Sequence, residues 1–178
     1  RFNGTYGDKL YMIEEHVGDE NIGLGIFGNP DDIISTTDLL LELRDDKDAQ
    51  VDESAYLKAR LFDMLIGDWD RHEDQWRWAM NEKEDGTKVY TPIPRDRDQA
   101  FPKYDGVFPA ILKFGAPLAR NMQTYAPEIQ NIKTFNNAVY YLDKSFINKA
   151  DWNDWKTQAE FIQNNLTDAE IDNAFAQL

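Results

Sequence analysis

The feature that most constrains the fold is an apolar helix pattern that runs directly into a dense cluster of charges. The segment "VDESAYLKARLFDMLIG" starts near Asp52, a residue type that caps helices, and Gly67 is a typical helix end. Apolar residues recur at helical spacing and form a wide stripe, namely Ala55, Ala59, Phe62 and Ile66, with Leu61 and Leu65 beside them. We therefore expect a helix packed on a core, which holds the start of the charged segment "DWDRHEDQ".

Two strand patterns follow the charges. The strands "WRWAM" and "KVYTPIP" flank "EDGT", in which Asp85–Gly86 predicts a two-residue type I′ turn. Trp76 would then face Arg95, Gln75 would face Asp96, and the prolines of the second strand predict an edge position. The hairpin would bring the carboxylates of "IPRDRDQAF" beside those of "GDWDRHEDQ".

Carboxylates that converge need compensating positive charge, because like charges at short range repel. Arg71, Arg95 and Arg97 could provide it in a network of salt bridges. An oxygen-ligand site for Mg²⁺, Mn²⁺ or Ca²⁺ is the alternative. The chain has no cysteine and no His-x-His or His-Glu-x-x-His pattern, so it lacks the usual motifs for zinc.

Composition limits the remaining classes. A length of 178 residues suits a single domain, 1–178, and the net charge of −14 argues against nonspecific binding to nucleic acid. No apolar run is long enough for a membrane span. Capping-box spacing predicts further helices from Ser35 and from Thr167, a helix is also expected over Asp151–Asn164, and residues 9–15 are typical of a strand. We expect an α+β domain that is mostly helical.

The pattern "LFDMLIGDWDRHEDQWRW … YTPIPRDRDQAF" resembles the catalytic core of atypical, protein-kinase-like phosphotransferases, nearest to the spore-coat CotH-type kinases. The HipA-type, secretory-pathway and phosphatidylinositol kinases are more distant. The resemblance covers roughly residues 4–101. It implies the C-lobe of a kinase-like fold with a central hairpin, a metal-dependent reaction with Mg²⁺ or Mn²⁺ and ATP, and a hydroxyl acceptor that is a protein or a small molecule.

The resemblance also assigns roles. Asp70 would be the catalytic aspartate, and Arg71 would be either a partner of phosphate or carboxylate groups or a structural strut. The metal ligands would be Gln75, Asp96 and Asp98, although Gln75 stands where such loops carry Asn. Backbone groups of Glu14, Glu15 and His16 would contact the adenine.

No Gly-rich strand-loop-strand and no lysine–glutamate pair of an N-lobe is found in the chain. We therefore expect a fragment, in which residues 1–16 are the last N-lobe strand and the hinge, and residues 17–178 are the C-lobe. The N-terminal lobe of the same protein would be its partner. Two other functions stay open: a catalytically degenerate kinase-fold binding or regulatory module, and an accessory region of a metal-dependent phosphohydrolase.

Overall fold

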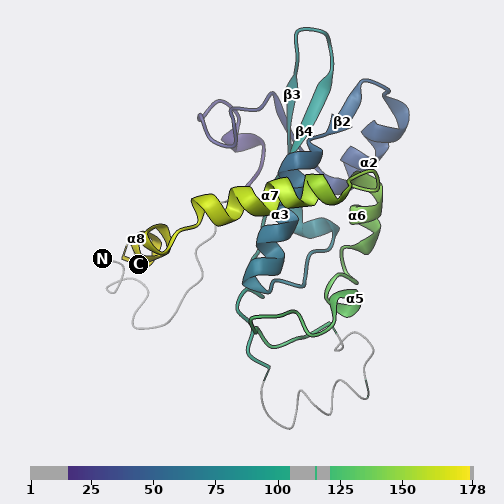
Figure 1. The fold of residues 1–178 in the computed structure, drawn as a ribbon. Coiled ribbons are helices and arrows are strands. Elements are labelled where there is room, and N and C mark those ends of the chain that lie inside the picture. The colour runs from purple at the N-terminus through teal and green to yellow at the C-terminus, as the bar shows by residue number, and fades with distance from the viewer. Residues whose placement is uncertain (1–15, 105–114, 116–120, 177–178) are drawn as a thin grey trace.

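A computed structural model describes residues 16–104, 115 and 121–176 of the chain. Within this part the fold is α+β, with six α-helices and one mixed sheet of four strands (Figure 1). The elements, in chain order, are η1 (Asp19–Asn21), β1 (Asp32–Ser35), α2 (Thr36–Asp45), β2 (Ala49–Val51), α3 (Glu53–Ile66), η2 (Glu73–Gln75), β3 (Trp76–Glu82), β4 (Lys88–Pro94), α5 (Ile132–Phe135), α6 (Tyr140–Phe146), α7 (Trp152–Asn165) and α8 (Asp168–Ala176). The strand predicted at residues 9–15 lies outside the described residues.

The helix starts and the end of α3 confirm the predictions. The side chains of Ser35, Asp52 and Asp151 accept hydrogen bonds from backbone N–H groups in the first turns of α2, α3 and α7. Gly67 closes α3 at φ 76°. A Cβ at Gly67 would lie 2.9 Å from Tyr125 Cδ2, so both the conformation and the close approach require glycine.

The hairpin is present, but its predicted register is wrong by one residue. Lys83 N donates to Thr87 O at 2.8 Å, so the loop has three residues, and the third of them, Gly86, has φ 84°. A type I turn followed by a left-handed glycine adds one residue to the loop. Trp76 consequently pairs with Pro94, and Arg95 N donates to Gln75 O at 2.9 Å, so that Gln75 faces Arg95.

The strand order is β1-β3-β4-β2, with β2 parallel to β4. The expected edge position of the second hairpin strand is therefore correct only in part. Lys88–Tyr90 of β4 pair with β2 on one side and with β3 on the other. Pro92 and Pro94 lie beyond the end of β2, where β4 needs no second partner.

An aromatic cluster between α3, the sheet and α6 forms the main core. The ring centroids of Tyr56 and Trp76 are 5.1 Å apart, and those of Trp78 and Phe146 are 4.9 Å apart. The face of α3 that is buried here carries Tyr56 and Leu57 together with the charged pair Arg60 and Asp63. The predicted apolar stripe of α3 is instead only partly covered, on the side that faces α7.

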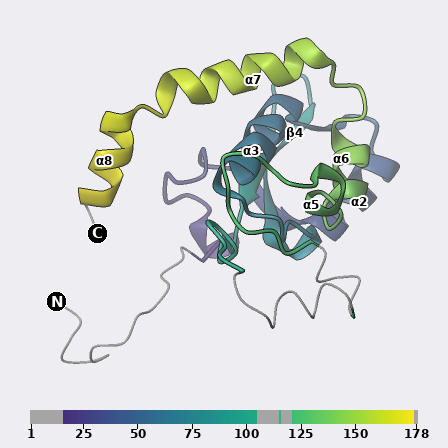
Figure 2. The same cartoon turned by 60° about the horizontal axis from the view of Figure 1, so that its bottom comes forward.

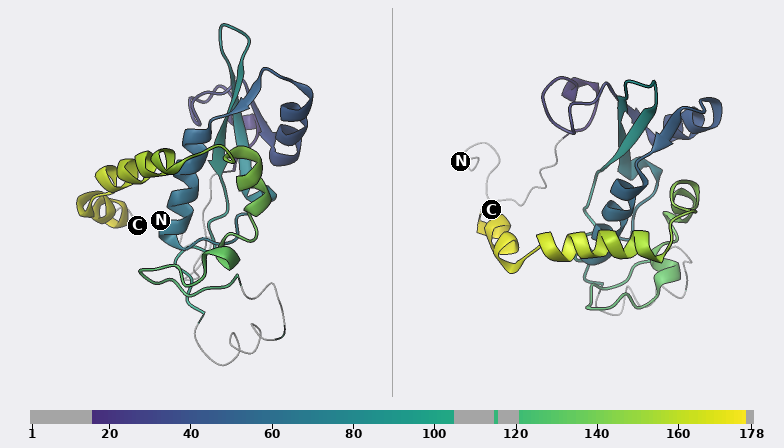
Figure 3. Two further views of the ribbon diagram at one scale, coloured as in Figure 1. Left: turned by 45° about the vertical axis from the view of Figure 1, so that its right-hand side comes forward. Right: turned by 45° about the horizontal axis from the view of Figure 1, so that its top comes forward.

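The views in Figures 2 and 3 show α7 crossing over α3 and leading to α8, which lies away from the sheet. No residue of α7 is fully buried, and Lys58 Nζ of α3 lies 4.6 Å from the ring centroid of Phe161. Among the described residues, none of the helices combines the length and the apolar character needed to cross a bilayer.

Candidate functional site

The charged segment after α3 is anchored by a buried network of ion pairs. Asp63 of α3 lies within ion-pair distance of three arginines, Arg60 at 3.2 Å, Arg71 at 3.3 Å and Arg97 at 3.1 Å. Arg60 also pairs with Asp143 of α6 at 3.0 Å, and Arg71 with Asp68 at 3.5 Å. Three positive and three negative side chains are therefore connected. Of the arginines considered from the sequence, Arg71 and Arg97 belong to this network, whereas Arg95 forms no ion pair with a carboxylate of the described residues.

Arg71 is a structural strut of this network. Its side chain is fully buried, and its guanidinium lies 4.5 Å from the ring centroid of Trp76. Nη1 donates to Arg95 O at 2.6 Å and Nη2 to Gln75 O at 2.9 Å, while Nε has only the ionic contact with Asp63. Of the two roles considered for Arg71, the geometry favours the structural strut, which ties the loop to the base of the hairpin.

Asp68 is fully buried at the start of the loop. Burial raises the pKa of this carboxyl from 3.8 to about 7, and the charge of Asp63 adds to the effect, whereas Arg71 opposes it. Asp68 Oδ1 also accepts a hydrogen bond from Asp70 N at 3.4 Å. Asp68 therefore fixes the backbone of the next candidate residue, Asp70.

The buried Asp68 predicts that stability falls as pH rises. Its folded pKa of about 7 exceeds its ordinary value of 3.8, so the folded chain binds the proton more tightly, and unfolding becomes easier between about pH 4 and 7. The raised pKa of Asp143 acts in the same direction. We expect a loss of roughly 2 kcal/mol between pH 5 and 8 in urea unfolding, and a much smaller loss in Asp68→Asn. An unmodified protein with a flat profile over this range would contradict the expectation.

The hairpin brings two of the three predicted metal ligands together. Gln75 Nε2 lies 3.2 Å from Asp96 Oδ2, although these residues are not directly opposed in the sheet. The contact arises because β4 ends at Pro94 and Asp96 has a left-handed backbone with φ 47°, which turns its side chain toward Gln75. Asp98, the third predicted ligand, is exposed in the turn that follows.

The hydrogen bonds around Gln75 contain a conflict. His72 Nδ1 accepts from Asp74 N at 3.3 Å, which leaves the proton of a neutral imidazole on Nε2. That Nε2–H faces Gln75 Nε2 at 3.3 Å, a contact between two donors. Exchanging the amide O and N of Gln75 removes the conflict, since Oε1 then accepts from His72. The exchange would also replace the hydrogen bond that Gln75 Nε2 donates to Asp96 Oδ2 at 3.2 Å with two oxygens that repel each other, so it requires a cation between them.

Asp70 lies half-buried between Asp68 and the strut Arg71. No hydrogen bond or ion pair of its carboxylate is formed with the described residues. Asp70 lies close enough to Tyr104 for its charge to raise the pKa of that phenol, after burial, which is the main cause. A carboxylate that is fixed through its backbone and has no partner can take a proton from a bound group.

Tyr104 belongs to a hydrogen-bonded chain beside Asp70 that the sequence patterns did not single out. Trp69 Nε1 donates to the Tyr104 hydroxyl at 3.1 Å, and that hydroxyl donates to Gln99 Oε1 at 2.6 Å. The negative charge of Asp98 also raises the pKa of the Tyr104 phenol. The contact with Trp69 of "DWD" could not have been read from spacing, because 35 positions separate the two partners.

The predicted adenine contacts are not tested by the fold. Glu14 and Glu15 lie outside the described residues. His16 is exposed, and its Nδ1 contacts Glu20 at the start of the η1 turn. This contact lowers the pKa of Glu20, after the larger effect of its own backbone hydrogen bond.

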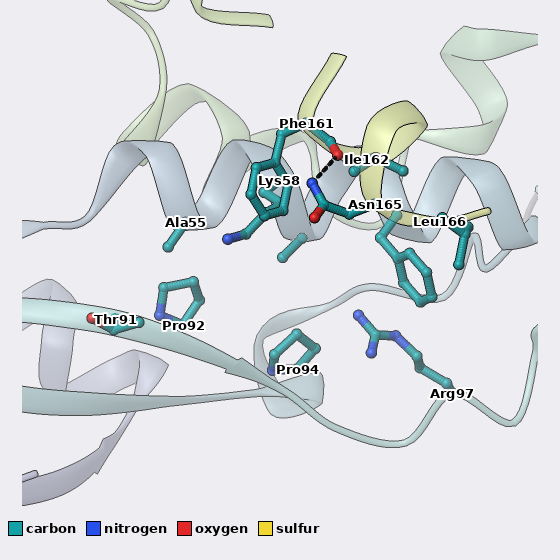
Figure 4. Close-up of a pocket in the computed structure, with 12 residues that line it drawn as sticks. Ala55, Lys58, Thr91, Pro92, Pro94, Arg97, Phe161, Ile162, Asn165 and Leu166 are labelled. Carbon is teal, nitrogen blue, oxygen red and sulfur yellow. Dashed lines mark hydrogen bonds between the residues drawn. The ribbon is translucent and has the colours of Figure 1, made fainter. Parts of the chain in front are cut away.

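A cavity of about 460 Å³ lies on the opposite side of β4, between α3 and α7 (Figure 4). Its walls are mostly apolar and include Pro92, Pro94, Phe161 and part of the predicted stripe of α3. Arg97 reaches the cavity from the loop after β4, with its guanidinium 5.0 Å from the ring centroid of Phe62. Arg97 thus connects this cavity to the buried network at Asp63.

No group of three or more His, Asp or Glu side chains in a metal-binding arrangement occurs among residues 16–104, 115 and 121–176. The candidate pair of Gln75 and Asp96 would need further oxygen ligands from a bound nucleotide or water. Comparisons with family models, with curated proteins and with solved structures found no match to the chain. The chemistry of the site is therefore derived from its own residues.

Proposed function

We propose that the chain is the C-lobe part of a metal-dependent phosphotransferase of the kinase-like kind, with Asp70 as its base and Gln75 and Asp96 as metal ligands. The observation that carries the proposal is the hydrogen bond of 3.2 Å from Gln75 Nε2 to Asp96 Oδ2, because it brings the side chains of two predicted metal ligands together. This pair lies beside the loop of Asp70, whose carboxylate forms no hydrogen bond or ion pair with the described residues. Buried ion pairs of Arg71 hold that loop in place.

The donor set fits a hard divalent cation. Carboxylate and amide oxygens are ligands of Mg²⁺ and Mn²⁺, and Mg²⁺ in nucleotide sites is held by one or two protein groups plus phosphates and water. With its amide exchanged, Gln75 would offer Oε1 beside Asp96 Oδ2, and His72 Nε2–H would orient that amide. A bound cation would neutralise charge that develops on the transferred phosphoryl group.

Asp70 would orient the acceptor hydroxyl and take its proton as the hydroxyl oxygen bonds to the terminal phosphorus of ATP and the bond to ADP breaks. Asp68 would support this role through the hydrogen bond from Asp70 N, and Arg71 would keep the loop against the hairpin. Because phosphoryl transfer depends mainly on positioning and charge, a rigidly anchored loop is the main contribution of the protein.

A degenerate binding module is the second candidate, and the side chain of Gln75 favours it. Glutamine has one more methylene than the asparagine of related loops, which shifts the position of a metal bound through its amide. Such a module would bind metal and nucleotide without transfer. Residues 1–16 as hinge, the adenine contacts of Glu14, Glu15 and His16, and a separate N-terminal lobe remain predictions from the resemblance.

Metal and nucleotide binding is tested by thermal unfolding of the full available chain. We expect Mn²⁺ with ATP to raise Tm by a few degrees, because a ligand at about 100 times its Kd adds about 2.7 kcal/mol to the free energy of unfolding. Asp96→Asn should abolish the rise that depends on the metal. The matched control Asp172→Asn, an exposed position in α8, should retain it. No rise with any combination of Mg²⁺, Mn²⁺ and ATP would refute the proposal.

A further inference from the structure

The described part of the chain contains six arginines, Arg44, Arg60, Arg71, Arg77, Arg95 and Arg97. Ion pairs with Asp engage four of these, Arg44, Arg60, Arg71 and Arg97. Among the described residues, Arg77 and Arg95 have no carboxylate within 4 Å. This is unexpected in a chain with 33 acidic and 19 basic residues, where a carboxylate is seldom far away.

The two arginines without ion pairs are also neighbours on one face of the hairpin. Arg77 lies two residues after Gln75 along the strand, and Arg95 pairs with Gln75 across it, so all three side chains emerge on the same side. Asp96, which follows Arg95, contacts Gln75 on this side. The arginine pair therefore adjoins the candidate metal ligands.

No nearby carboxylate of the described residues compensates for placing these two positive charges next to each other. The side chains of Arg77 and Arg95 lie on the same face of neighbouring strands, so the two positive charges repel each other. Asp74 and Asp38 oppose this effect only from a distance. Arg95 Nε is buried and has no hydrogen-bond partner in the described part of the chain. Within the same part, the Arg77 side chain donates only to Trp76 O, at 2.9 Å.

Buried donors without partners and repelling like charges both cost free energy, and they persist mainly where function needs them. Two guanidinium groups on neighbouring strands present several N–H donors, which match phosphate oxygens in paired geometry. A monoanion offers phosphate oxygens to one of these groups, whereas a diphosphate offers one phosphate group to each of them.

We propose that Arg77 and Arg95 form an anion site for the diphosphate part of a nucleotide, beside Gln75 and Asp96. This inference rests on the proposed function for its choice of ligand, because it places the phosphates next to the metal ligands. It also gives the chain a source of positive charge for phosphates.

The test uses inorganic pyrophosphate with EDTA present, so that no divalent metal contributes, and follows binding by calorimetry. We expect the unmodified protein to bind pyrophosphate, and each of Arg77→Gln and Arg95→Gln to weaken binding by about tenfold. The matched control Arg44→Gln removes an exposed arginine that is paired with Asp45, and it should bind as the unmodified protein does.

Folding of the variants is checked by Tm without ligand. We expect Tm to stay unchanged or to rise in Arg95→Gln, because the substitution removes repulsion and breaks no ion pair. A lowered Tm together with unchanged pyrophosphate binding would show that the pair is structural and would overturn the inference. Equal binding by the double variant and the unmodified protein, or no binding by either, would also overturn it.

Failure here and failure of the proposed function can be told apart. Asp96→Asn should not weaken binding of pyrophosphate in EDTA, because no metal is involved in that measurement and the substitution removes a negative charge beside the anion site. If binding depends on the arginines but no transfer from ATP is ever found, the anion site stands and the phosphotransferase proposal falls. If transfer occurs but Arg77→Gln and Arg95→Gln leave pyrophosphate binding unchanged, the phosphotransferase proposal stands and the anion site falls.

Discussion

Replacing Asp63 by Asn should destabilise the protein by about 3–5 kcal/mol, since removing one partner of a buried ion pair leaves charges uncompensated. Asp63 is fully buried and contacts three arginines, so the change leaves these positive charges with only Asp68 and Asp143 as acidic partners, and burial raises the pKa of both. Asn keeps the shape of the side chain, so the loss of stability results from the removed charge and not from a change in side-chain volume. Chemical unfolding should show it, with a fall in Tm of roughly 10 °C.

Two comparisons test whether the buried network causes the loss of stability in Asp63→Asn. Asp45→Asn removes an exposed partner of Arg44 and should leave Tm unchanged, because solvent screens that pair. Adding Arg97→Gln to Asp63→Asn removes the excess charge from the one arginine of the three that keeps some exposure, 32%. The double variant should therefore be more stable than the sum of the two single changes indicates. Strict additivity would show that these charges do not interact.

The parts of the fold that depend on short-range rules were predictable. Ser35, Asp52 and Asp151 act as caps, and Gly67 ends α3, because each of these choices is determined within a few residues of the chain. The hairpin was found for the same reason. The register of the hairpin was not predictable, because Asp85–Gly86 fits both a two-residue turn and a three-residue loop with a bulge. These two loops shift the strand pairing by one residue relative to each other.

The buried face of α3 could not be predicted from the sequence, for a different reason. Arg60 and Asp63 look like surface residues in the helical pattern, and they are buried because distant groups neutralise them. The partner of Arg60, Asp143, is 83 positions further along the chain. Likewise, the contact between Gln75 and Asp96 was expected from the hairpin, but its geometry depends on the left-handed backbone of Asp96, for which the sequence carries no signal.

Replacing Asp70 by Asn should reduce transfer from ATP by about 10²–10⁴-fold, the usual contribution of a general base. The substitution removes the proton acceptor and keeps the size of the side chain. We expect no change in Tm, because the Asp70 carboxylate forms no hydrogen bond or ion pair with the described residues, and its backbone N–H can still donate to Asp68. Release of ADP in the presence of Mn²⁺ provides the measurement.

The neighbouring Asp74→Asn is the matched control, because Asp74 is exposed in the same loop and carries the same charge. It should retain most of the activity. Loss of activity in Asp74→Asn but not in Asp70→Asn would assign the base to Asp74. Binding separates the two functions: if Asp70→Asn keeps the rise in Tm with Mn²⁺ and ATP but loses ADP release, Asp70 acts on the reaction itself. If the unmodified protein shows that rise and never releases ADP, the chain is the degenerate binding module, and Asp70 has no proton to accept.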